Sequence, residues 1–176
     1  MPTLYGERWN EWLDEPIEPL TEDEARARHE RGELYTVAYI PEGRTKALGA
    51  VEVRLQVGHA AVYQFDEHAR ITQIRSFSKR GDRMFLEEVT DYEYPDGTER
   101  LRVDQASVMT EHTYNEDGTG RRTVYQLGAG EADGWDLSLK PGQTMENHWT
   151  AIPAFGDYDG LGRAGFDQKP DAREAL

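Results

Sequence analysis

Three segments with the same pattern, in and around Arg70–Leu127, constrain the fold of this chain most strongly. In each, an alternating stretch ends near an aromatic residue, a polar turn follows, and a new alternating stretch begins. The aromatic residues are Phe65, Tyr94 and Tyr114. The turns after Tyr94 and Tyr114 contain Asp-Gly pairs, which tolerate the left-handed backbone that tight hairpins require. The sequence therefore predicts an antiparallel sheet built from hairpins.

Alternation of apolar and polar residues continues outside these segments, so the sheet is expected to be large. Between Val51 and Val57 every second residue is apolar, as in a strand with one wet face. Thr98–Asn115 contains no Gly or Pro, and the parity of its apolar residues changes, which indicates one long strand with a β-bulge. The turn spacing predicts about eight to ten strands in up-and-down order.

The chain is expected to form one domain in three parts. Residues 1–33 are predicted to be an N-terminal helical cap with two short helices. The first is an amphipathic turn at Trp9–Leu13, and the second begins at a Thr-Glu-Asp-Glu capping box. Residues 34–152 are predicted to form a β-barrel domain. Residues 153–176, rich in Gly, Asp and Pro, are predicted to be a loosely ordered C-terminal tail.

The predicted fold class is all-β with two short N-terminal helices: an antiparallel up-and-down meander that closes into a barrel or a strongly curled sheet. This architecture resembles that of the calycins, the lipocalin-like barrels, although the lipocalin GxW signature is absent at the first strand. Asp66–Phe77 resembles the terminal strand of SnoaL/NTF2-like cone folds, and the Asp-Gly hairpins resemble the YD repeats of toxin shells. We expect the curled sheet to shelter one of its faces from water.

The composition and the absence of known motifs argue against several classes of function. The net charge of −14 argues against nucleic acid and against an anionic membrane surface as partners, because both are bound by clustered Lys and Arg. The absence of cysteine removes disulfides, thiolate nucleophiles and Cys-based metal sites. No P-loop, GxSxG or HExxH motif is present, so no cofactor is expected. The N-terminus has no apolar signal-peptide core, and no apolar run reaches the length of a membrane span, so a cytoplasmic location is expected.

A cluster of Tyr and His residues is the first candidate site. His112 and Tyr114 share one face of a predicted strand. Tyr92, Tyr94 and Tyr125 come from neighbouring segments, and we expect them to line the same cavity. Such side chains have an apolar body and a polar tip, which suits an aromatic or polyketide-like ligand and acid–base chemistry. Ordinary cross-strand aromatic pairing explains the same residues without a ligand.

A second candidate site lies near the end of the predicted sheet. If Met145–Ile152 is a strand, Glu146 and His148 point to one face and could act as an acid–base pair. Trp149 beside them is expected to contact the ligand. Together with His112 they would supply two imidazoles and a carboxylate, a set that can hold a divalent metal. The alternative is that Glu146 and His148 face solvent.

The sequence leaves three functions open. The leading hypothesis is a small-molecule-binding protein, or a cofactor-free enzyme of the cyclase, isomerase or lyase type, that uses the barrel interior. The first alternative is an acidic immunity or inhibitor protein that binds a basic toxin or nuclease through an acidic stripe at Glu87, Asp91 and Glu93. The second alternative is a metal-dependent enzyme. The ligand and the oligomeric state, a homodimer included, stay open.

Overall fold

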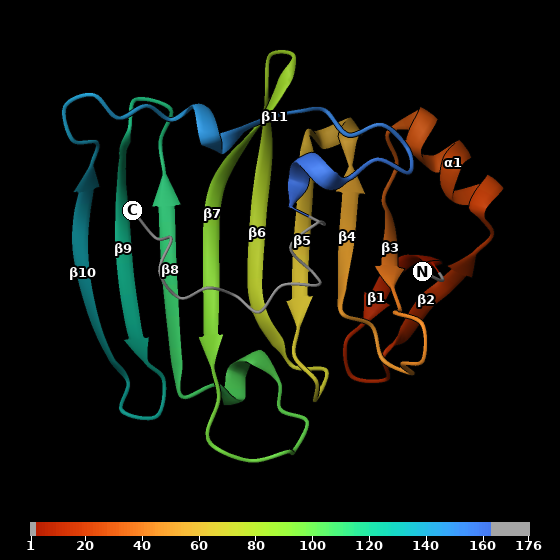
Figure 1. The fold of residues 1–176 in the computed structure, drawn as a ribbon, viewed down its shortest axis with the longest axis horizontal. Helices are drawn as coiled ribbons and strands as arrows, with labels where there is room; N and C mark the ends of the chain where they lie inside the picture. Colours follow the sequence, from red (N-terminus) through yellow and green to blue (C-terminus); the bar gives the residue numbers. More distant parts are fainter. Residues whose placement is uncertain (1–2, 163–176) are drawn as a thin grey trace.

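A computed structural model describes residues 3–162, which form one antiparallel sheet of 11 strands and a single α-helix (Figure 1). The strands are β1 (Thr3–Asn10), β2 (Glu15–Leu20), β3 (Tyr35–Tyr39), β4 (Gly49–Arg54), β5 (His59–Phe65), β6 (Ile71–Arg80), β7 (Arg83–Glu93), β8 (Val108–Tyr114), β9 (Thr119–Gln126), β10 (Glu131–Ser138) and β11 (Trp149–Ala151). The helix is α1 (Glu22–Arg31), and short 3-10 turns are η1 (Leu55–Val57), η2 (Val103–Gln105), η3 (Glu146–His148) and η4 (Asp159–Leu161). Among these residues no helix has the length and apolarity that crossing a membrane requires.

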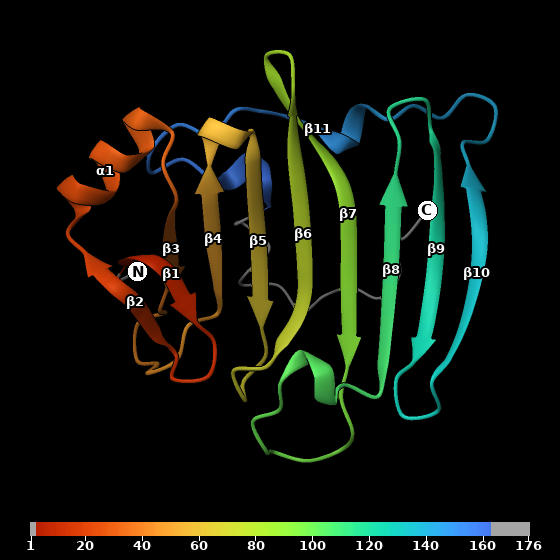
Figure 2. The ribbon, with the colours of Figure 1, turned by 180° about the vertical axis from the view of Figure 1, so that it is seen from behind.

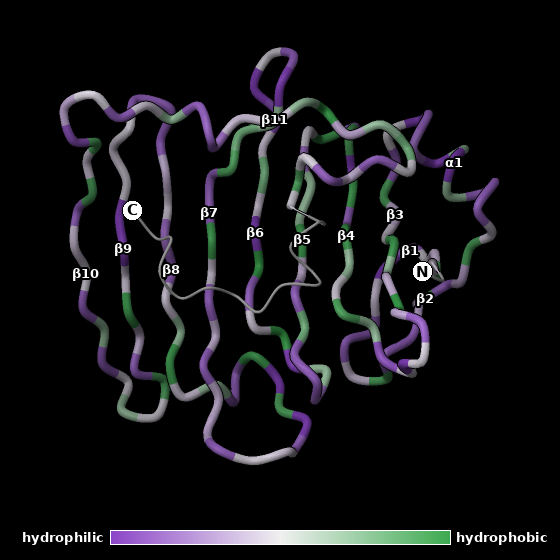
Figure 3. The backbone as a smooth tube through the Cα atoms, in the orientation of Figure 1, coloured by the Kyte–Doolittle hydropathy of each residue, from purple (hydrophilic) through white to green (hydrophobic). Residues whose placement is uncertain are grey.

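The sheet is a meander, because nearly every strand pairs with its neighbour in the chain. The strand order is β10-β9-β8-β7-β6-β5-β4-β3-β1-β2, and β11 adds to β7 beyond the end of β8. Hydrophobic and hydrophilic residues alternate along the strands (Figure 3), so each strand gives one set of side chains to each face. The predicted all-β, antiparallel class is confirmed.

Each face of the sheet carries its own hydrophobic cluster. The larger cluster includes Tyr35, Val51, Val62 and Phe77, which are all buried. The smaller cluster, on the opposite face, includes Ala38, Ala50 and Phe65, with partly buried aromatic residues around it. The larger cluster is complete only because a segment from the end of the chain covers it.

This covering segment, Trp149–Gly162, is called the clasp below. It crosses the sheet from β7 toward α1 and turns back in front of β5, and in the view from behind it passes beyond the strands (Figures 1 and 2). Tyr158 and Leu161 of the clasp are each 1% exposed and belong to the larger cluster. The hydroxyl of Tyr158 lies 2.9 Å from that of Tyr35 on β3, so a hydrogen bond fastens the clasp to the sheet. Phe155 lies under the guanidinium of Arg26 on α1, 4.4 Å from it.

The helix α1 forms for the local reasons visible in the sequence. The Thr21 hydroxyl accepts from the Glu24 amide, and the Glu24 carboxylate accepts from the Thr21 amide, which completes the capping box. Gly32 ends the helix at φ 70°, a left-handed conformation that favours glycine. The helix prediction at this position is confirmed.

The predicted closure into a barrel is wrong for the described residues, which form an open sheet with β2 and β10 at its edges. β10 is exposed on both faces except at Leu137, which is partly exposed. Apart from Trp135 and Leu137, such a strand has little apolar surface that closure would bury. The clasp covers the larger hydrophobic cluster instead, so the sheet has no need to curl onto itself.

The prediction for the first helix is also wrong. Residues 3–20 form the hairpin β1–β2, and β1 pairs with β3, so this part of the predicted helical cap belongs to the sheet. The carboxamide of Asn10 accepts from the amides of Trp12 and Leu13, which stabilises a turn there. The helical spacing of Trp12 and Leu13 therefore arises in a turn, and both side chains are exposed.

Two other predicted segments differ from the structure. Thr98–Asn115 is no single strand, because residues 98–107 form a loop with η2 before β8 begins at Val108. The bulges lie instead between β5 and β6 and between β6 and β7. Residues 153–162 were expected to be loosely ordered, yet they form part of the clasp with buried aromatic and aliphatic side chains. The rest of the predicted tail lies outside the described residues.

Candidate functional site

One row of side chains crosses the covered face of the sheet and changes from apolar to polar at β6. The cross-strand register aligns Val37, Val51, Val62, Arg75, Val89, His112, Arg122 and Trp135, from β3 to β10. The valines of β3, β4 and β5 are buried in the larger cluster. From Arg75 onward the face carries charged, imidazole and aromatic groups. The candidate site lies at this boundary, where the clasp meets the polar half.

Arg75 is partly buried and is positioned by a short chain of hydrogen bonds. Its Nε donates to Gln73 Oε1 at 2.6 Å, and Gln73 Nε2 donates to Asp91 Oδ1 at 2.7 Å. Gln73 and Asp91 face each other across β6 and β7, so the register brings them together. Burial lowers the pKa of Arg75, and the charge of Asp91 acts in the opposite direction. Among the described residues Arg75 forms no salt bridge.

Three rings from two distant parts of the chain form an aromatic wall beside Arg75. His112 and Tyr114 lie on the same face of β8, with ring centroids 6.3 Å apart and planes nearly parallel at 5°. His148, in η3, packs edge-on against Tyr114 at 4.4 Å. The structure therefore brings together three of the four predicted catalytic residues. His112 is 6% exposed, so it lies inside the fold rather than on the surface.

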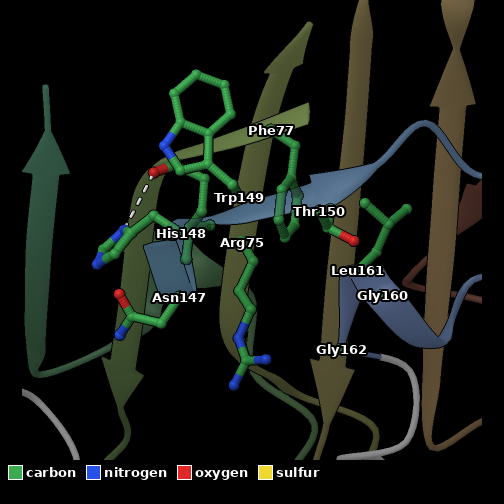
Figure 4. Close-up of a pocket in the computed structure, with 10 residues that line it drawn as sticks. Arg75, Phe77, Asn147, His148, Trp149, Thr150, Gly160, Leu161 and Gly162 are labelled. Carbon is green, nitrogen blue, oxygen red and sulfur yellow. Dashed lines mark hydrogen bonds between the residues drawn. The ribbon is translucent and has the colours of Figure 1, made fainter. Parts of the chain in front are cut away.

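A pocket of about 100 Å³ lies between the sheet and the clasp (Figure 4). Its apolar wall is formed by Phe77, Leu86 and Leu161, and its polar wall includes Arg75, Asn147, His148 and Thr150. In Figure 4 the guanidinium of Arg75 lies below Phe77, between Asn147 and Gly162. The pocket thus has a hydrophobic end and an end with a positive charge.

A second, smaller hollow of about 20 Å³ lies on the other side of His148. Tyr114, Leu137, Leu139 and Met145 contribute to its lining. His148 lines both hollows. A change at this residue would alter both spaces at once.

Burial lowers the pKa of His112 and of His148 from their ordinary value of 6.5. Burial is the largest cause in both cases, because the charged imidazolium loses hydration. Nδ1 of His148 lies 3.4 Å from the carbonyl oxygen of Leu86, an acceptor, which favours the tautomer with the proton on Nδ1. At neutral pH His148 is then a neutral base with Nε2 as its acceptor nitrogen.

The lowered pKa of His148 makes stability depend on pH. Between the folded pKa and 6.5 the unfolded chain binds a proton that the folded chain does not, so the free energy of unfolding falls as pH falls below about 6.5. Urea unfolding at pH 7.5 and pH 5.5 should show a smaller loss on acidification in His148→Gln than in the unchanged chain. A ¹H NMR titration of the His148 ring should give a pKa below 6.5. An equal loss in both chains would contradict this expectation.

The predicted tyrosines do not join His112. Tyr92 and Tyr125 lie opposite Met109 on either side of β8, and Tyr92 packs against the smaller cluster on the other face. Tyr94 follows β7, donates its hydroxyl to the Ile71 carbonyl at 2.8 Å and lies under the Arg70 guanidinium. The prediction that these residues line one cavity with His112 is wrong. Successive residues of a strand point to opposite faces, so a shift of one position moves a side chain to the other face.

The prediction that Glu146 and His148 share a face of a strand is also wrong. Both belong to the 3-10 turn η3, and β11 begins only at Trp149. Glu146 is exposed and accepts a hydrogen bond from Arg83 at 2.6 Å. Within residues 3–162 no group of His, Asp and Glu side chains is arranged to hold a metal ion. The indole of Trp149 packs on the Phe85 ring at 4.8 Å, and in Figure 4 it points away from Arg75.

The predicted acidic stripe does not form a continuous surface. The β6–β7 register shifts between Ser76 and Phe77, so Glu87 is passed over in the pairing. Asp91 faces the candidate site, where it binds Gln73. Glu93 lies at the end of β7 and is exposed. The three carboxylates therefore have different surroundings.

No sequence motif marks five of the residues that line the pocket: Arg75, Asn147, Thr150, Gly160 and Gly162. An arginine in a strand is usually expected to face solvent. Arg75 lies two residues before the buried Phe77 on β6, however, so both side chains point to the covered face. Gly160-Leu161-Gly162 has the spacing of a glycine-rich turn, which signals a close backbone approach. The run 160–165 also fits GxGxxG, but that fingerprint needs a βαβ unit, and this sheet is antiparallel.

Comparisons of the chain with protein-family models, with curated proteins and with solved structures found no significant match.

Proposed function

We propose that this chain binds a small molecule in the pocket between the clasp and the polar half of the sheet. The observation that carries the proposal is the division of this pocket into an apolar wall and a polar wall. Ligand sites in proteins combine such apolar lining with a few placed polar groups. A pocket of about 100 Å³ suits a compact ligand or one end of a longer one.

The chemistry of His148 supports a reactive role in addition to binding. The imidazole is neutral at neutral pH, lines the pocket, and has its acceptor nitrogen available when Nδ1 faces Leu86. A neutral base next to a bound ligand suits proton abstraction in an isomerase or a cyclase reaction without a cofactor. The aromatic neighbour Tyr114 restricts the orientation of the ring.

Native mass spectrometry of the full chain, purified from the cells that make it, tests the proposal. We expect a population with the added mass of one small molecule, which acid denaturation releases. Leu86→Trp places a larger side chain at the pocket wall and should abolish the added mass.

Ile74→Trp is the matched control. Ile74 is also a partly buried aliphatic residue, but it packs against the smaller cluster on the opposite face. This variant should keep the added mass. Absence of any bound molecule from the unchanged chain, or full retention of it by Leu86→Trp, would contradict the proposal. The alternative of a basic protein partner and the cytoplasmic location stay predictions from the sequence.

A further inference from the structure

The charge of the ligand can be inferred from Arg75, the first polar residue of its row on the covered face. Val62 lies beside it on β5 and Val89 beside it on β7. A guanidinium placed between two aliphatic neighbours loses part of its hydration, which destabilises the charge unless an anion or an acceptor compensates. The position therefore favours a polar partner.

Among the described residues, hydrogen bonds satisfy only one side of this guanidinium. Nε donates to Gln73, and Gln73 in turn donates to Asp91. Within residues 3–162 the terminal Nη1 and Nη2 groups have no acceptor, and they lie at the polar wall of the pocket. The Gln73–Asp91 pair thus fixes the plane of the guanidinium and leaves its outer edge toward the pocket.

Two glycines make room for the polar side chains at this edge. A Cβ on Gly162 would collide with Nη1 of Arg75, and a Cβ on Gly160 would collide with the Thr150 hydroxyl. Gly162 has φ +94°, which side chains rarely adopt. Any other residue at Gly162 would force the guanidinium to move. Both glycines line the pocket, so the absence of their side chains lets the guanidinium lie at the pocket wall.

The shape of the pocket indicates the kind of anion. A guanidinium edge matches a carboxylate through two parallel hydrogen bonds. One cation with Asp91 nearby, in a chain of net charge −14, favours a single negative charge over the two charges of phosphate. The apolar wall of Phe77, Leu86 and Leu161 then receives a short hydrocarbon. The pocket is smaller than the cavity of about 150 Å³ that holds benzene in an engineered protein.

We propose that Arg75 binds the carboxylate of a short-chain monocarboxylic acid whose hydrocarbon end lies against Phe77, Leu86 and Leu161. This inference rests on the proposed function, and it adds the chemical class of the ligand. Gln73 and Asp91 are positioning residues, because they act on the ligand only through Arg75.

The test is a set of NMR titrations of the ¹⁵N-labelled full chain at neutral pH, observed at the Arg75 Nε–H signal and at the backbone amides of the clasp. Butyrate should shift these signals to saturation. Butyramide, which has the same shape without the charge, should bind at least about tenfold more weakly. Inorganic phosphate should also bind more weakly than butyrate, because the apolar wall contributes nothing to its affinity.

Two variants at the same position locate the effect. Arg75→Gln should lose butyrate binding by about tenfold or more, whereas Arg75→Lys should keep a preference for butyrate over butyramide with reduced affinity. Arg54→Gln removes the same charge from an exposed position on β4 and should leave butyrate binding unchanged. The urea midpoint of Arg75→Gln is measured to show whether this variant is folded. The comparison of butyrate with butyramide in the unchanged chain tests the carboxylate assignment without any variant.

The chain itself carries carboxylates after Gly162, and one of these could bind Arg75 in place of a free carboxylic acid. A second experiment distinguishes the two. A full-length chain with Asp167→Asn, Asp171→Asn and Glu174→Gln should bind butyrate as the unchanged chain does. If butyrate binds only to this triple variant, a carboxylate of the chain occupies Arg75, and the inference is overturned.

Other outcomes distinguish failure of the carboxylate assignment from failure of the proposed small-molecule binding. Equal binding of butyramide and butyrate, preference for phosphate, or unchanged butyrate affinity in Arg75→Gln would each overturn the carboxylate assignment. A neutral molecule found in the pocket by native mass spectrometry would overturn it as well and leave the proposed function standing. A chain that binds none of these probes and carries no natural ligand would refute both.

Discussion

Replacing Tyr158 with alanine is expected to lower the free energy of unfolding by about 3 to 5 kcal/mol, the range for removing a buried aromatic ring. Tyr158 is 1% exposed and packs in the larger cluster, and its hydroxyl lies 2.9 Å from that of Tyr35. The substitution removes both the ring and the bond that fastens the clasp. Urea unfolding followed by tryptophan fluorescence measures the change.

Tyr158→Phe is the control, because it keeps the ring and removes only the hydroxyl. We expect it to lower the free energy of unfolding by about 1 kcal/mol, the typical net contribution of a hydrogen bond. The difference between the two variants then measures the packing of the ring. If Tyr158→Ala unfolded at the same urea concentration as the unchanged chain, the clasp would not be part of the cooperative core.

Replacing Phe77 with alanine is expected to lower the free energy of unfolding by about 3 kcal/mol or more and to enlarge the pocket. Phe77 is 4% exposed, belongs to the larger cluster and forms part of the apolar wall beside Leu86 and Leu161. The space left by the ring joins the pocket instead of forming an isolated void. A longer or bulkier carboxylate such as benzoate should therefore bind better to this variant than to the unchanged chain. Urea unfolding and the same NMR titrations measure the two effects.

Phe65→Ala provides the matched comparison. Phe65 is a phenylalanine of similar burial, 8% exposed, but it belongs to the smaller cluster on the other face. It should lose comparable stability without any change in the preference between butyrate and benzoate. A change in ligand preference in both variants would show that general loosening, and not the pocket wall, controls selectivity.

Local patterns in the sequence predicted the elements that depend on neighbouring residues. The capping box at Thr21, the turn before Gly118 and the alternation of β4 are each set within a few positions of the chain. Whether the sheet closes into a barrel could not be predicted from such local patterns. It depends on what covers the apolar face, and the clasp that does so comes from a Gly- and Asp-rich stretch that resembles a disordered tail by composition.

The candidate site shows the same division. His112 and Tyr114 were recognised because residues two apart on a strand share a face. Tyr92 and Tyr125 were assigned to the same cavity although the register places them on the other face. Arg75 was missed because its role depends on the clasp, whose position across β6 no local pattern specifies.

The hairpins of the meander close short loops, whereas the pairing of β11 with β7 joins segments that are far apart in the chain. Only three residue pairs, along Trp149–Ala151, hold this connection in the sheet. Release of the clasp therefore breaks few backbone hydrogen bonds and leaves every hairpin intact, but it also exposes the buried side chains of Tyr158 and Leu161. Because Leu161 both lines the pocket and packs in the larger cluster, opening the pocket by this route would cost core packing, so exchange of a bound molecule by clasp release is coupled to the stability of the fold.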